Sequence, residues 1–589
     1  MASTTAPLRP QVPTPPPNKP PNKSSSKIEA STSTPNPQCS ILIIGAGATG
    51  LLASLRAHYQ GLTPLLIEKT SFLGGTSSLT GGSVWIPCNP ITFPPSASTS
   101  TTSSKPSNQD TLPSALTYLT TLIDPIGPVS SLERKLAFLT QGPKMVEWLR
   151  EVGFKWISAP RFPDYYPEVE GASLGRSVEG EVFDAKKLGK WEALMARSET
   201  QTDVAVHASE SNVFPIFWRT WGLFFLFLKI VLVRTVGWRV LGRRPVTMGR
   251  SLIAQLMLLV KNRGLEVWRE TELIRLLLEE GNVVGAVVKR EEKEVEIRAS
   301  KGVLLCAGGF ARYLEMRREY FQAPASDEWT MVPPPDTGDA IRAGQEIGAA
   351  TALMDDAWWY PTFVNPRTGE RHLCPYERWL PHGIIVDSSG KRFMNEAQSY
   401  FDCGQQQYER NKTVPAIPAW LVMDSQHRQK YLLWKMLPGR TPERAFTDGW
   451  LKKAASLSEL AEEIGVDAEG LTSTVTHFNK MVAKGTDDDF NRGTSLYDQY
   501  YGDPTMTPNP NLGTIELSPF YAIQIWPGDL GMKGGLLTDE YSRVVRENGE
   551  VIPGLYAAGN TAASVMGRMY PGPGSTLGPA MTSENLDGG

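Results

Sequence analysis

Near the C-terminal end of the chain, Tyr570 opens a run of alternating proline and glycine from Pro571 to Gly574. Proline fixes the backbone angle φ, and glycine allows conformations that other residues avoid. Such a run does not continue as regular helix or strand, so it predicts a rigid turn. This turn holds one phenol, a group that can donate a hydrogen bond or transfer a proton, in a fixed place.

Two more tyrosines stand in unusual surroundings. Tyr165 lies between Pro163 and Pro167, and Tyr400 follows a predicted strand-turn-strand segment that begins at Gly383. Each tyrosine alone is compatible with an ordinary core or rim aromatic, but the three together favour a chemical role. Because none of the six histidines has a recognisable catalytic context, we expect tyrosine to carry proton transfer. The histidines are His58, His207, His372, His382, His427 and His477.

The elements that must position these residues begin with a nucleotide-binding unit. A short apolar strand at 41–44 leads into a G-x-G-x-x-G motif and a helical pattern, and a second strand within 63–69 ends near an acidic residue. The glycines of this motif make a tight turn and admit a pyrophosphate, which faces the helix N-terminus. A bare glycine motif could be a turn without a ligand, but strand, helix and acid together favour a nucleotide. The expected contacts are Gly45, Gly47, Ala48, Gly50, Glu68 and Lys69.

A second glycine-rich loop at 68–87 favours FAD over NAD. It resembles the loop after the first βαβ unit in flavoproteins of the fumarate reductase and 3-ketosteroid dehydrogenase superfamily. The segments 301–312 and 554–564 resemble the later flavin-side strands of that superfamily. The resemblance implies further FAD contacts at Gly75, Thr76, Ser77, Gly81, Gly82, Ala307, Gly308, Gly559, Asn560 and Leu577. Succinate dehydrogenases attach their flavin through a histidine in this loop. Because the loop has no histidine in this sequence, we predict non-covalent FAD.

Composition argues against several classes of protein. A net charge of −3 over 589 residues gives no reason to propose a nucleic-acid partner. Five scattered cysteines without a CxxC pair predict a reducing compartment and neither a disulfide framework nor a metal site. No apolar leader is seen, so we expect an intracellular protein without a signal peptide. Residues 1–38 and the insertion 91–110 are rich in Pro, Ser and Thr, which predicts disorder in both.

The segment 212–244 is strongly apolar and aromatic, but Arg219, Lys229 and Arg234 interrupt it. Its uncharged run from Thr220 to Leu228 is too short to span a bilayer. Basic residues among aromatic ones are typical of an interfacial helix. We therefore expect peripheral membrane contact through 213–236. The alternative is a buried or substrate-lining pair of helices.

Four separated segments resemble the signature segments of 3-ketosteroid Δ1-dehydrogenases, in the expected order from Ser40 to Met581. They are RFPDYYPEVEG, DSSGKRFMNEAQSY, GDLGMKGGLLTD and GNTAASVMGRMYPGPGSTLGPAM. The resemblance implies that Tyr400 takes the proton from steroid C2 with the help of Tyr165. It further implies that Tyr570 and the Gly574 backbone N–H hold the C3 carbonyl oxygen, while the C1 hydride passes to N5 of FAD. An external acceptor, quinone or oxygen, then takes the electrons.

The fold expected from this resemblance is α/β, a discontinuous Rossmann-like FAD-binding domain with an inserted α+β domain that caps the substrate. We place the FAD-binding domain at 39–356 and 528–589, and the substrate domain at 357–527. The expected substrate is a 3-keto steroid or a steroid-like triterpenoid ketone.

Two rivals remain open. One is another oxidoreductase of the superfamily, a Δ4-dehydrogenase or an enoate reductase. The other is an inactive sterol-binding flavoprotein, because the family usually continues after Met581 as a long helix and this chain stops at Gly589.

Overall fold

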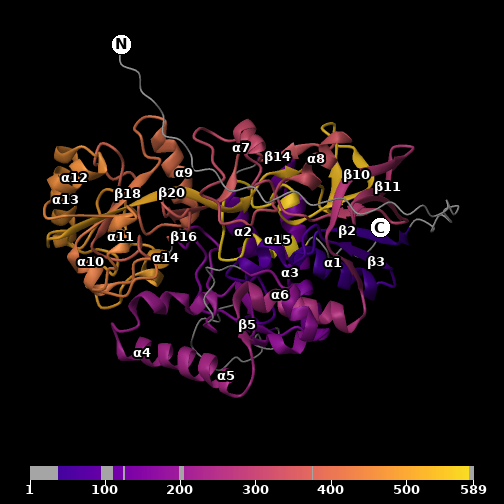
Figure 1. Cartoon of the computed structure of the whole chain (residues 1–589), viewed down its shortest axis with the longest axis horizontal. Coiled ribbons are helices and arrows are strands. Elements are labelled where there is room, and N and C mark those ends of the chain that lie inside the picture. Colours follow the sequence, from indigo (N-terminus) through magenta and orange to yellow (C-terminus); the bar gives the residue numbers. More distant parts are fainter. Residues whose placement is uncertain (1–36, 95–109, 124–125, 198–203, 375, 583–589) are drawn as a thin grey trace, which may run out of the picture. The chain divides into compact units, whose positions relative to one another are not determined.

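A six-stranded sheet carries the glycine motif (Figure 1). Its strand order is β22-β23-β13-β2-β3-β9, in which β22 is antiparallel to β23 and all other neighbours are parallel. The bounds are β2 Ile41–Ile44, β3 Pro64–Ile67, β9 Glu266–Trp268, β13 Val303–Leu305, β22 Arg543–Val545 and β23 Val551–Ala557. Strands from the beginning, middle and end of the chain therefore form one sheet. This confirms the predicted α/β class with a discontinuous nucleotide-binding fold.

The computed structural model describes residues 37–94, 110–123, 126–197, 204–374 and 376–582. The predicted disordered tail at 1–38 and the predicted disordered insertion at 91–110 lie almost entirely outside these described residues.

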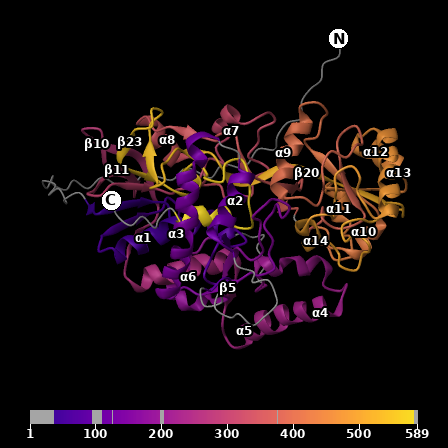
Figure 2. The same ribbon diagram turned by 180° about the vertical axis from the view of Figure 1, so that it is seen from behind.

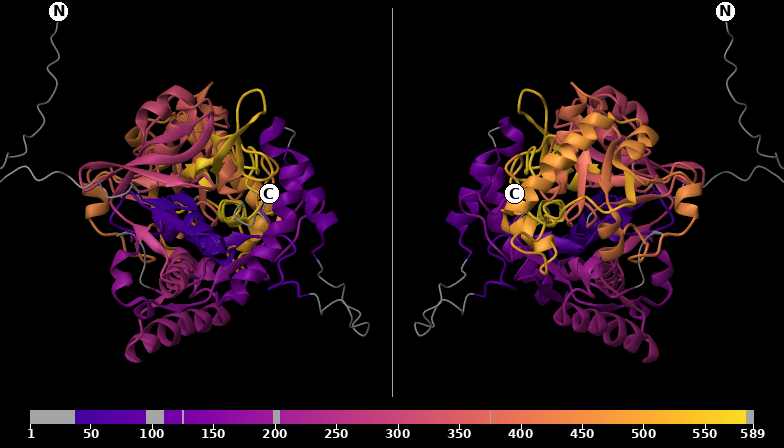
Figure 3. Two further views of the ribbon diagram at one scale, coloured as in Figure 1. Left: turned by 90° about the vertical axis from the view of Figure 1, so that its right-hand side faces the viewer. Right: turned by 90° about the vertical axis from the view of Figure 1, so that its left-hand side faces the viewer.

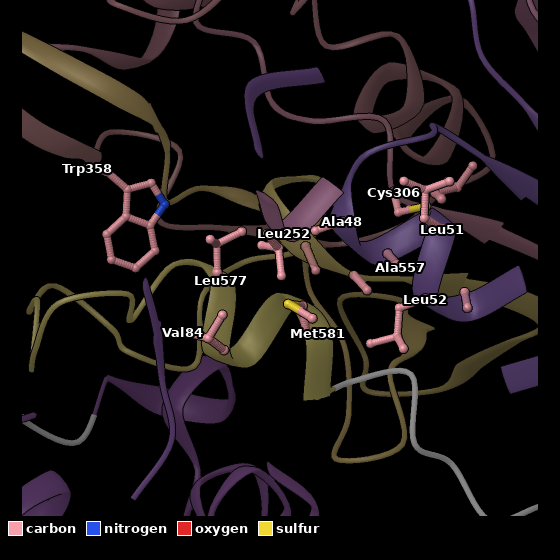
Figure 4. Close-up of a cluster of buried hydrophobic side chains, with 14 of the residues drawn as sticks. Ala48, Leu51, Leu52, Val84, Leu252, Cys306, Trp358, Ala557, Leu577 and Met581 are labelled. Carbon is pink, nitrogen blue, oxygen red and sulfur yellow. The ribbon is translucent and has the colours of Figure 1, made fainter. Parts of the chain in front are cut away.

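Helix α1, Ala48–Tyr59, follows β2 through a close backbone turn. Gly45 has φ +110°, and a Cβ on Gly50 would lie 1.9 Å from the Gly45 carbonyl oxygen, so the turn requires glycine at both positions. Figure 4 shows apolar side chains of α1 beside side chains from distant segments, all buried in one core. The labelled members are Ala48, Leu51, Leu52, Val84, Leu252, Cys306, Trp358, Ala557, Leu577 and Met581.

Smaller sheets and further helices complete this part of the chain. A four-stranded sheet contains β1 Gln38–Cys39, β12 Lys293–Ala299, β11 Asn282–Arg290 and β10 Thr271–Glu279. A three-stranded sheet contains β4 Ser83–Trp85, β6 Ser177–Gly180 and β5 Trp156–Ser158. Two strand pairs are β7 Phe183–Asp184 with β8 Pro245–Val246, and β14 Thr351–Ala352 with β21 Gly535–Leu536. The helices are α2 Leu112–Leu122, α3 Leu132–Glu151, α6 Met248–Asn262, α7 Leu314–Tyr320, α8 Asp339–Glu346 and α15 Leu577–Thr582.

A second large sheet is antiparallel throughout and has the order β16-β15-β20-β18-β17, with β19 also pairing with β20. The bounds are β15 Ala357–Val364, β16 Arg371–Leu373, β17 Gly383–Val386, β18 Ala419–Met423, β19 Leu451–Ala454 and β20 Phe520–Met532. The predicted boundary at 357 coincides with the start of β15, whereas the one at 527/528 falls inside β20. The domain boundaries stay a prediction.

In the described part of the chain, six α-helices lie between β17 and β20 in sequence (Figure 2). They are α9 Tyr400–Asn411, α10 Ser425–Lys430, α11 Arg444–Thr447, α12 Leu457–Ile464, α13 Ala468–Lys484 and α14 Leu496–Tyr501. Helix α12 begins with a capping box, in which Ser456 and Glu459 each accept a hydrogen bond from the backbone of the other. Its apolar face packs with α13 in a small core of its own.

The apolar segment 212–244 forms a chain of short helical pieces (purple in Figure 3). They are η5 Ala208–Ile216, α4 Trp221–Leu228, the π-helix η6 Lys229–Gly237 and α5 Trp238–Val240. Within the part of the chain that the structure describes, no helix is long and apolar enough to cross a membrane.

Candidate active site

A cavity of about 1140 Å³ lies at the carboxyl ends of β2 and β3, where the glycine motif follows β2. Its lining contains most of the residues predicted to contact the cofactor: Gly45, Gly47, Ala48, Glu68, Lys69, Gly75, Thr76, Ser77, Ala307, Gly308, Gly559, Asn560 and Leu577. Ligands of open parallel sheets bind at this edge. The lining also includes Met195, Ala196 and the Pro333–Asp336 turn, which the sequence analysis missed because they carry no recognisable motif.

Three of the predicted cofactor residues do not line this cavity: Gly50, Gly81 and Gly82. A Cβ on Gly82 would meet the Met248 carbonyl carbon at 2.2 Å, and a Cβ on Gly81 would lie 3.3 Å from Ala208. Gly50 packs against the Gly45 carbonyl in the same way. These glycines therefore allow the glycine loops to pack closely against neighbouring backbone.

Glu68 shapes the loop as well as facing the cavity. One carboxylate oxygen accepts a hydrogen bond from the Ala46 backbone N–H at 3.0 Å, and the other accepts from the backbone and hydroxyl of Thr70. The neighbouring Lys69 donates to Asp339 at 2.5 Å and to Thr337 at 2.7 Å. The ammonium of Lys69 holds the pKa of Asp339 below its usual range even though burial raises it.

The residues of the cavity fit a dinucleotide that carries a flavin. Gly47 and Gly75 leave room beside the N-terminus of α1, because a Cβ on either would meet nothing closer than 3.6 Å. The lining extends from Glu68 and Lys69 to Thr576 and Leu577, directly after the Pro-Gly turn. No described residue of the lining is a histidine; the non-covalent attachment stays a prediction.

The three predicted tyrosines meet in one buried cluster. The Tyr165 and Tyr400 hydroxyl oxygens lie 2.6 Å apart. The Tyr570 ring lies 5.2 Å from the Tyr165 ring and 5.3 Å from the Tyr400 ring, measured between centroids. None of the three side chains is more than 7% exposed. The three tyrosines thus lie together in the structure although they are far apart along the chain.

The Pro-Gly turn is held by hydrogen bonds from several elements. The Pro571 carbonyl accepts from the Tyr165 backbone N–H at 2.9 Å and from the Tyr118 hydroxyl of α2 at 2.7 Å. The Pro573 carbonyl accepts from the Ser177 hydroxyl of β6 at 2.7 Å. One of these bonds ties Tyr165 directly to the turn that carries Tyr570.

Gly574 occupies a position that only glycine can fill. Its φ is +100°, and a Cβ would lie 2.3 Å from the Ser83 carbonyl oxygen. Burial raises the pKa of Tyr570, while hydrogen bonds from Tyr400, Thr576 and the Gly574 backbone N–H lower it. The Gly574 backbone N–H is therefore close to the Tyr570 hydroxyl.

The predicted second strand before Tyr400 is wrong. After β17 the chain makes only an isolated bridge between Val386 and Arg392, and Tyr400 is the first residue of α9. The cause is Glu396, a fully buried carboxylate that pairs with Arg392 and Arg492 and so holds the chain in a loop. The Ser399 hydroxyl accepts from the Phe401 N–H and caps α9.

Aromatic residues that the sequence analysis did not assign surround the cluster. The Tyr360 ring stacks on Tyr400 at 4.1 Å, and Tyr497 packs against Tyr165 at 4.9 Å. Trp358 packs against Tyr570 at 5.0 Å. The aromatic run that Trp358 opens was the available signal for this wall. Burial and the neighbouring phenols raise the pKa values of Tyr165 and Tyr400 well above their usual range.

The chain matches the family model for an FAD binding domain over residues 40–577. It is 40% identical over 564 residues to the 3-oxosteroid 1-dehydrogenase of Mycolicibacterium smegmatis, covering 92% of this chain and 95% of that protein. It is 33% identical to the 4-oxocyclohexanecarboxylate 2-dehydrogenase of Sinomonas cyclohexanicum, covering 94% of this chain and 93% of that protein. A solved structure, the 3-ketosteroid delta1-dehydrogenase of Sterolibacterium denitrificans with 1,4-androstadiene-3,17-dione, aligns with a TM-score of 0.85 and 36% identity. The alignment covers 93% of this chain and 98% of that one. The predicted cofactor, FAD, is confirmed.

Proposed function

Because the chain belongs to the 3-ketosteroid Δ1-dehydrogenase family of FAD-dependent oxidoreductases, we propose that it introduces a C1=C2 double bond into a 3-keto steroid or a steroid-like triterpenoid ketone. The observation that carries this proposal is the hydrogen-bonded pair of Tyr165 and Tyr400 beside Tyr570. Phenols in contact suit proton removal next to a ketone, where the enolate oxygen needs donors.

The Tyr570 hydroxyl and the Gly574 N–H hold the C3 oxygen. The negative charge that develops there as C2–H becomes acidic is stabilised by both donors, each worth about 3–4 kcal/mol. Tyr400 takes the C2 proton as the phenolate and becomes a neutral phenol, and the Tyr165 hydroxyl donates a hydrogen bond to the phenolate oxygen. Bound FAD supplies the acceptor for the C1 hydride. The Tyr360 ring, stacked on Tyr400, and the Tyr497 ring, edge-on to Tyr165, keep water from the phenol pair.

Anaerobic mixing of the holoenzyme with androst-4-ene-3,17-dione tests the proposal. Bleaching of the flavin absorbance together with a 1,2-ene product supports it. A double bond at another position would identify a different dehydrogenase of the superfamily, and binding without bleaching would identify an inactive sterol-binding flavoprotein. A parallel series with triterpenoid 3-ketones and 4-oxocyclohexanecarboxylate defines the substrate class.

The electrons leave to an external acceptor, a quinone or oxygen. Mixing the reduced enzyme with each acceptor in turn and following the return of the oxidised flavin spectrum distinguishes the two. Reoxidation by neither acceptor would contradict this part of the proposal.

We also propose that the segment 221–241 contacts a membrane surface, the source of a lipid-soluble substrate. Many of its apolar side chains are exposed, which argues against the alternative of a buried helix pair: Trp221 is 77%, Phe225 62%, Val233 66%, Val240 80% and Leu241 71% exposed. Exposed cations, Lys229, Arg239 and Arg243, interleave with them and suit anionic lipid.

Co-sedimentation with vesicles of anionic or neutral lipid tests the membrane contact. The triple variant Trp221→Ser, Phe225→Ser, Leu241→Ser is expected to lose binding to anionic vesicles. A matched variant at exposed apolar residues elsewhere, Leu496→Ser with Leu517→Ser, is expected to bind as the unchanged protein does. Equal binding by both variants would contradict the proposal.

A further inference from the structure

Among the described residues, four arginine side chains are less than 2% exposed, and one of them, Arg378, has no carboxylate partner there. Three are paired: Arg176 with Asp110 and Asp164, Arg317 with Asp529, and Arg492 with Glu396. Arg378 makes no ion pair with any residue in the described ranges. A buried guanidinium stays charged, and an unpaired charge in a protein interior is costly to keep.

The side-chain hydrogen bonds of Arg378 go to the loop before Tyr400 and to the first turn of α9. Nη1 donates to the carbonyls of Glu396 and Gln398, each at 2.6 Å, and to Cys403 Sγ at 3.4 Å. Cys403 lies on the first turn of α9, which Tyr400 begins. Nε and Nη2 have no hydrogen-bond partner among the described residues. Arg378 therefore contacts the start of this helix through one nitrogen, and its guanidinium lies over the Trp379 ring, with the central carbon 4.5 Å from the ring centroid, without a carboxylate partner among the described residues.

The guanidinium of Arg378 acts on two phenols, Tyr360 and Tyr497, that contact the Tyr165–Tyr400 pair. Arg378 lowers the pKa values of Tyr360 and Tyr497, in opposition to the rise that burial causes. Tyr360 stacks on Tyr400, and Tyr497 packs against Tyr165. Tyr360 and Tyr497 thus interact both with the guanidinium and with the pair.

We propose that Arg378 is a positioning residue that sets the start of α9 and supplies the positive field favouring negative charge on the Tyr165–Tyr400 pair during removal of the C2 proton. This inference rests on the proposed function. A phenol is a poor base at neutral pH, since its ordinary pKa is about 10. A nearby cation in an interior of low dielectric lowers the free energy of the phenolate.

Other charged and titratable groups face the same region. Burial raises the pKa values of the Asp402 and Glu377 carboxyls to about 7 each. Asp402 accepts from the Tyr166 hydroxyl at 2.7 Å, and Glu377 accepts from the Trp434 N–H at 2.8 Å, so neither is committed to Arg378. The remaining neighbours are the thiols of Cys374 and Cys403 and the phenols of Tyr165, Tyr360, Tyr497 and Tyr570.

A second buried basic side chain lies beside aromatic residues around the cluster. Lys533 Nζ donates to the carbonyls of Gly567 and Met569 and lies over the rings of Trp358 and Phe401. Burial lowers its pKa to about 7. Lys533 therefore contacts both Trp358, which packs against Tyr570, and Phe401, which follows Tyr400 on α9.

The test compares the pH dependence of kcat/KM for the holoenzyme and four variants, with a 3-keto steroid deuterated or not at C2. In Arg378→Gln we expect the rising limb of the profile to move up by about one pH unit, with about tenfold lower kcat/KM at neutral pH. The C2 isotope effect is expected to increase. Arg378→Lys keeps the charge, so it is expected to lower kcat without moving the limb.

A second pair neutralises the cation without removing it, which keeps the test valid if Arg378→Gln does not fold. Cys403→Asp places a carboxylate beside Nη1 and is expected to move the limb upward, whereas its uncharged match Cys403→Asn leaves it in place. The inference would be overturned if the rising limb of the pH profile moved equally, or not at all, in Arg378→Gln and Arg378→Lys and in Cys403→Asp and Cys403→Asn. Tyr400→Phe is measured under the same conditions. If it loses turnover while the Arg378 and Cys403 variants do not behave as expected, the inference about Arg378 fails and the proposed function stands.

Discussion

The hydroxyl oxygens of Tyr165 and Tyr400 lie 2.6 Å apart although 235 residues separate them along the chain. Tyr165 is fixed by the bond from its backbone N–H to the Pro571 carbonyl, and Tyr400 is fixed as the first residue of α9. The pair therefore joins the turn that carries Tyr570 to the helix of the second sheet. Removing one hydroxyl tests the proposed chemistry without removing the ring that fills the space.

Tyr400→Phe is expected to lower kcat by about 100- to 10,000-fold, the usual contribution of a general base. The flavin content is expected to stay unchanged, because Tyr400 does not line the cofactor cavity. Tyr408→Phe, two turns later on α9, is the matched control, since its hydroxyl only bonds the Pro324 carbonyl. Steady-state kinetics on both proteins decide the point, and near-normal turnover by Tyr400→Phe would rule out this base.

Gly574→Ala is expected to abolish most turnover while much of the fold survives. The new methyl group would lie 2.3 Å from the Ser83 carbonyl oxygen at φ +100°, so the turn must move away from Tyr570. Backbone strain of this kind costs about 1–3 kcal/mol, which a domain of this size tolerates. Gly222→Ala, at an exposed position with open space, is the control. Turnover and urea unfolding measured together separate a displaced turn from general unfolding, and normal turnover would contradict the role of Gly574.

Much of this site could be predicted because short local sequence patterns determine its backbone geometry. The glycine motif, the acid at Glu68 and the Pro-Gly turn each dictate backbone geometry within a few residues. The three tyrosines were found through proline and glycine neighbours and through a family resemblance. The roles of Gly81 and Gly82 as packing positions were not foreseen, because a glycine that admits a ligand and one that admits backbone look identical in sequence.

Long-range pairing could not be predicted. Nothing near Tyr400 signals that Glu396 is bound by Arg392 and Arg492, and those ion pairs replace the expected strand by a loop and a helix start. Arg378 was overlooked for the same reason, since a buried cation without a partner is defined only by what surrounds it. Similarly, the predicted division at 527/528 falls inside β20 because one strand of 13 residues joins both regions.

When the protein is precipitated with acid, we expect FAD to dissociate as an intact molecule, so that all flavin is found in the supernatant. The cofactor loop offers Thr76 and Ser77 rather than a histidine for attachment. In the native state, Gly50→Ala is expected to reduce bound flavin strongly, because its methyl group would lie 1.9 Å from the Gly45 carbonyl oxygen and push α1 from the loop. Absorbance of the purified proteins measures both results, with Gly61→Ala at an open surface turn as the control. Flavin retained in the acid pellet would contradict non-covalent binding.

Stability is expected to fall as the pH is lowered, partly through the buried His427. Burial lowers its pKa to about 3, against about 6.5 in an unfolded chain. Between these values the unfolded chain binds a proton that the folded protein excludes, so this contribution is complete above about pH 6.5 and is lost toward pH 3. Glu377 acts in the opposite sense, because its raised pKa favours the folded state at low pH.

His427→Gln is expected to flatten the rise of unfolding free energy with pH by up to about 1.4 kcal/mol per pH unit relative to the unchanged protein. Urea unfolding of the holoenzyme across this range measures the slope, with His477→Gln at an exposed position as the control. An unchanged slope in His427→Gln would show that this histidine is protonated equally in both states.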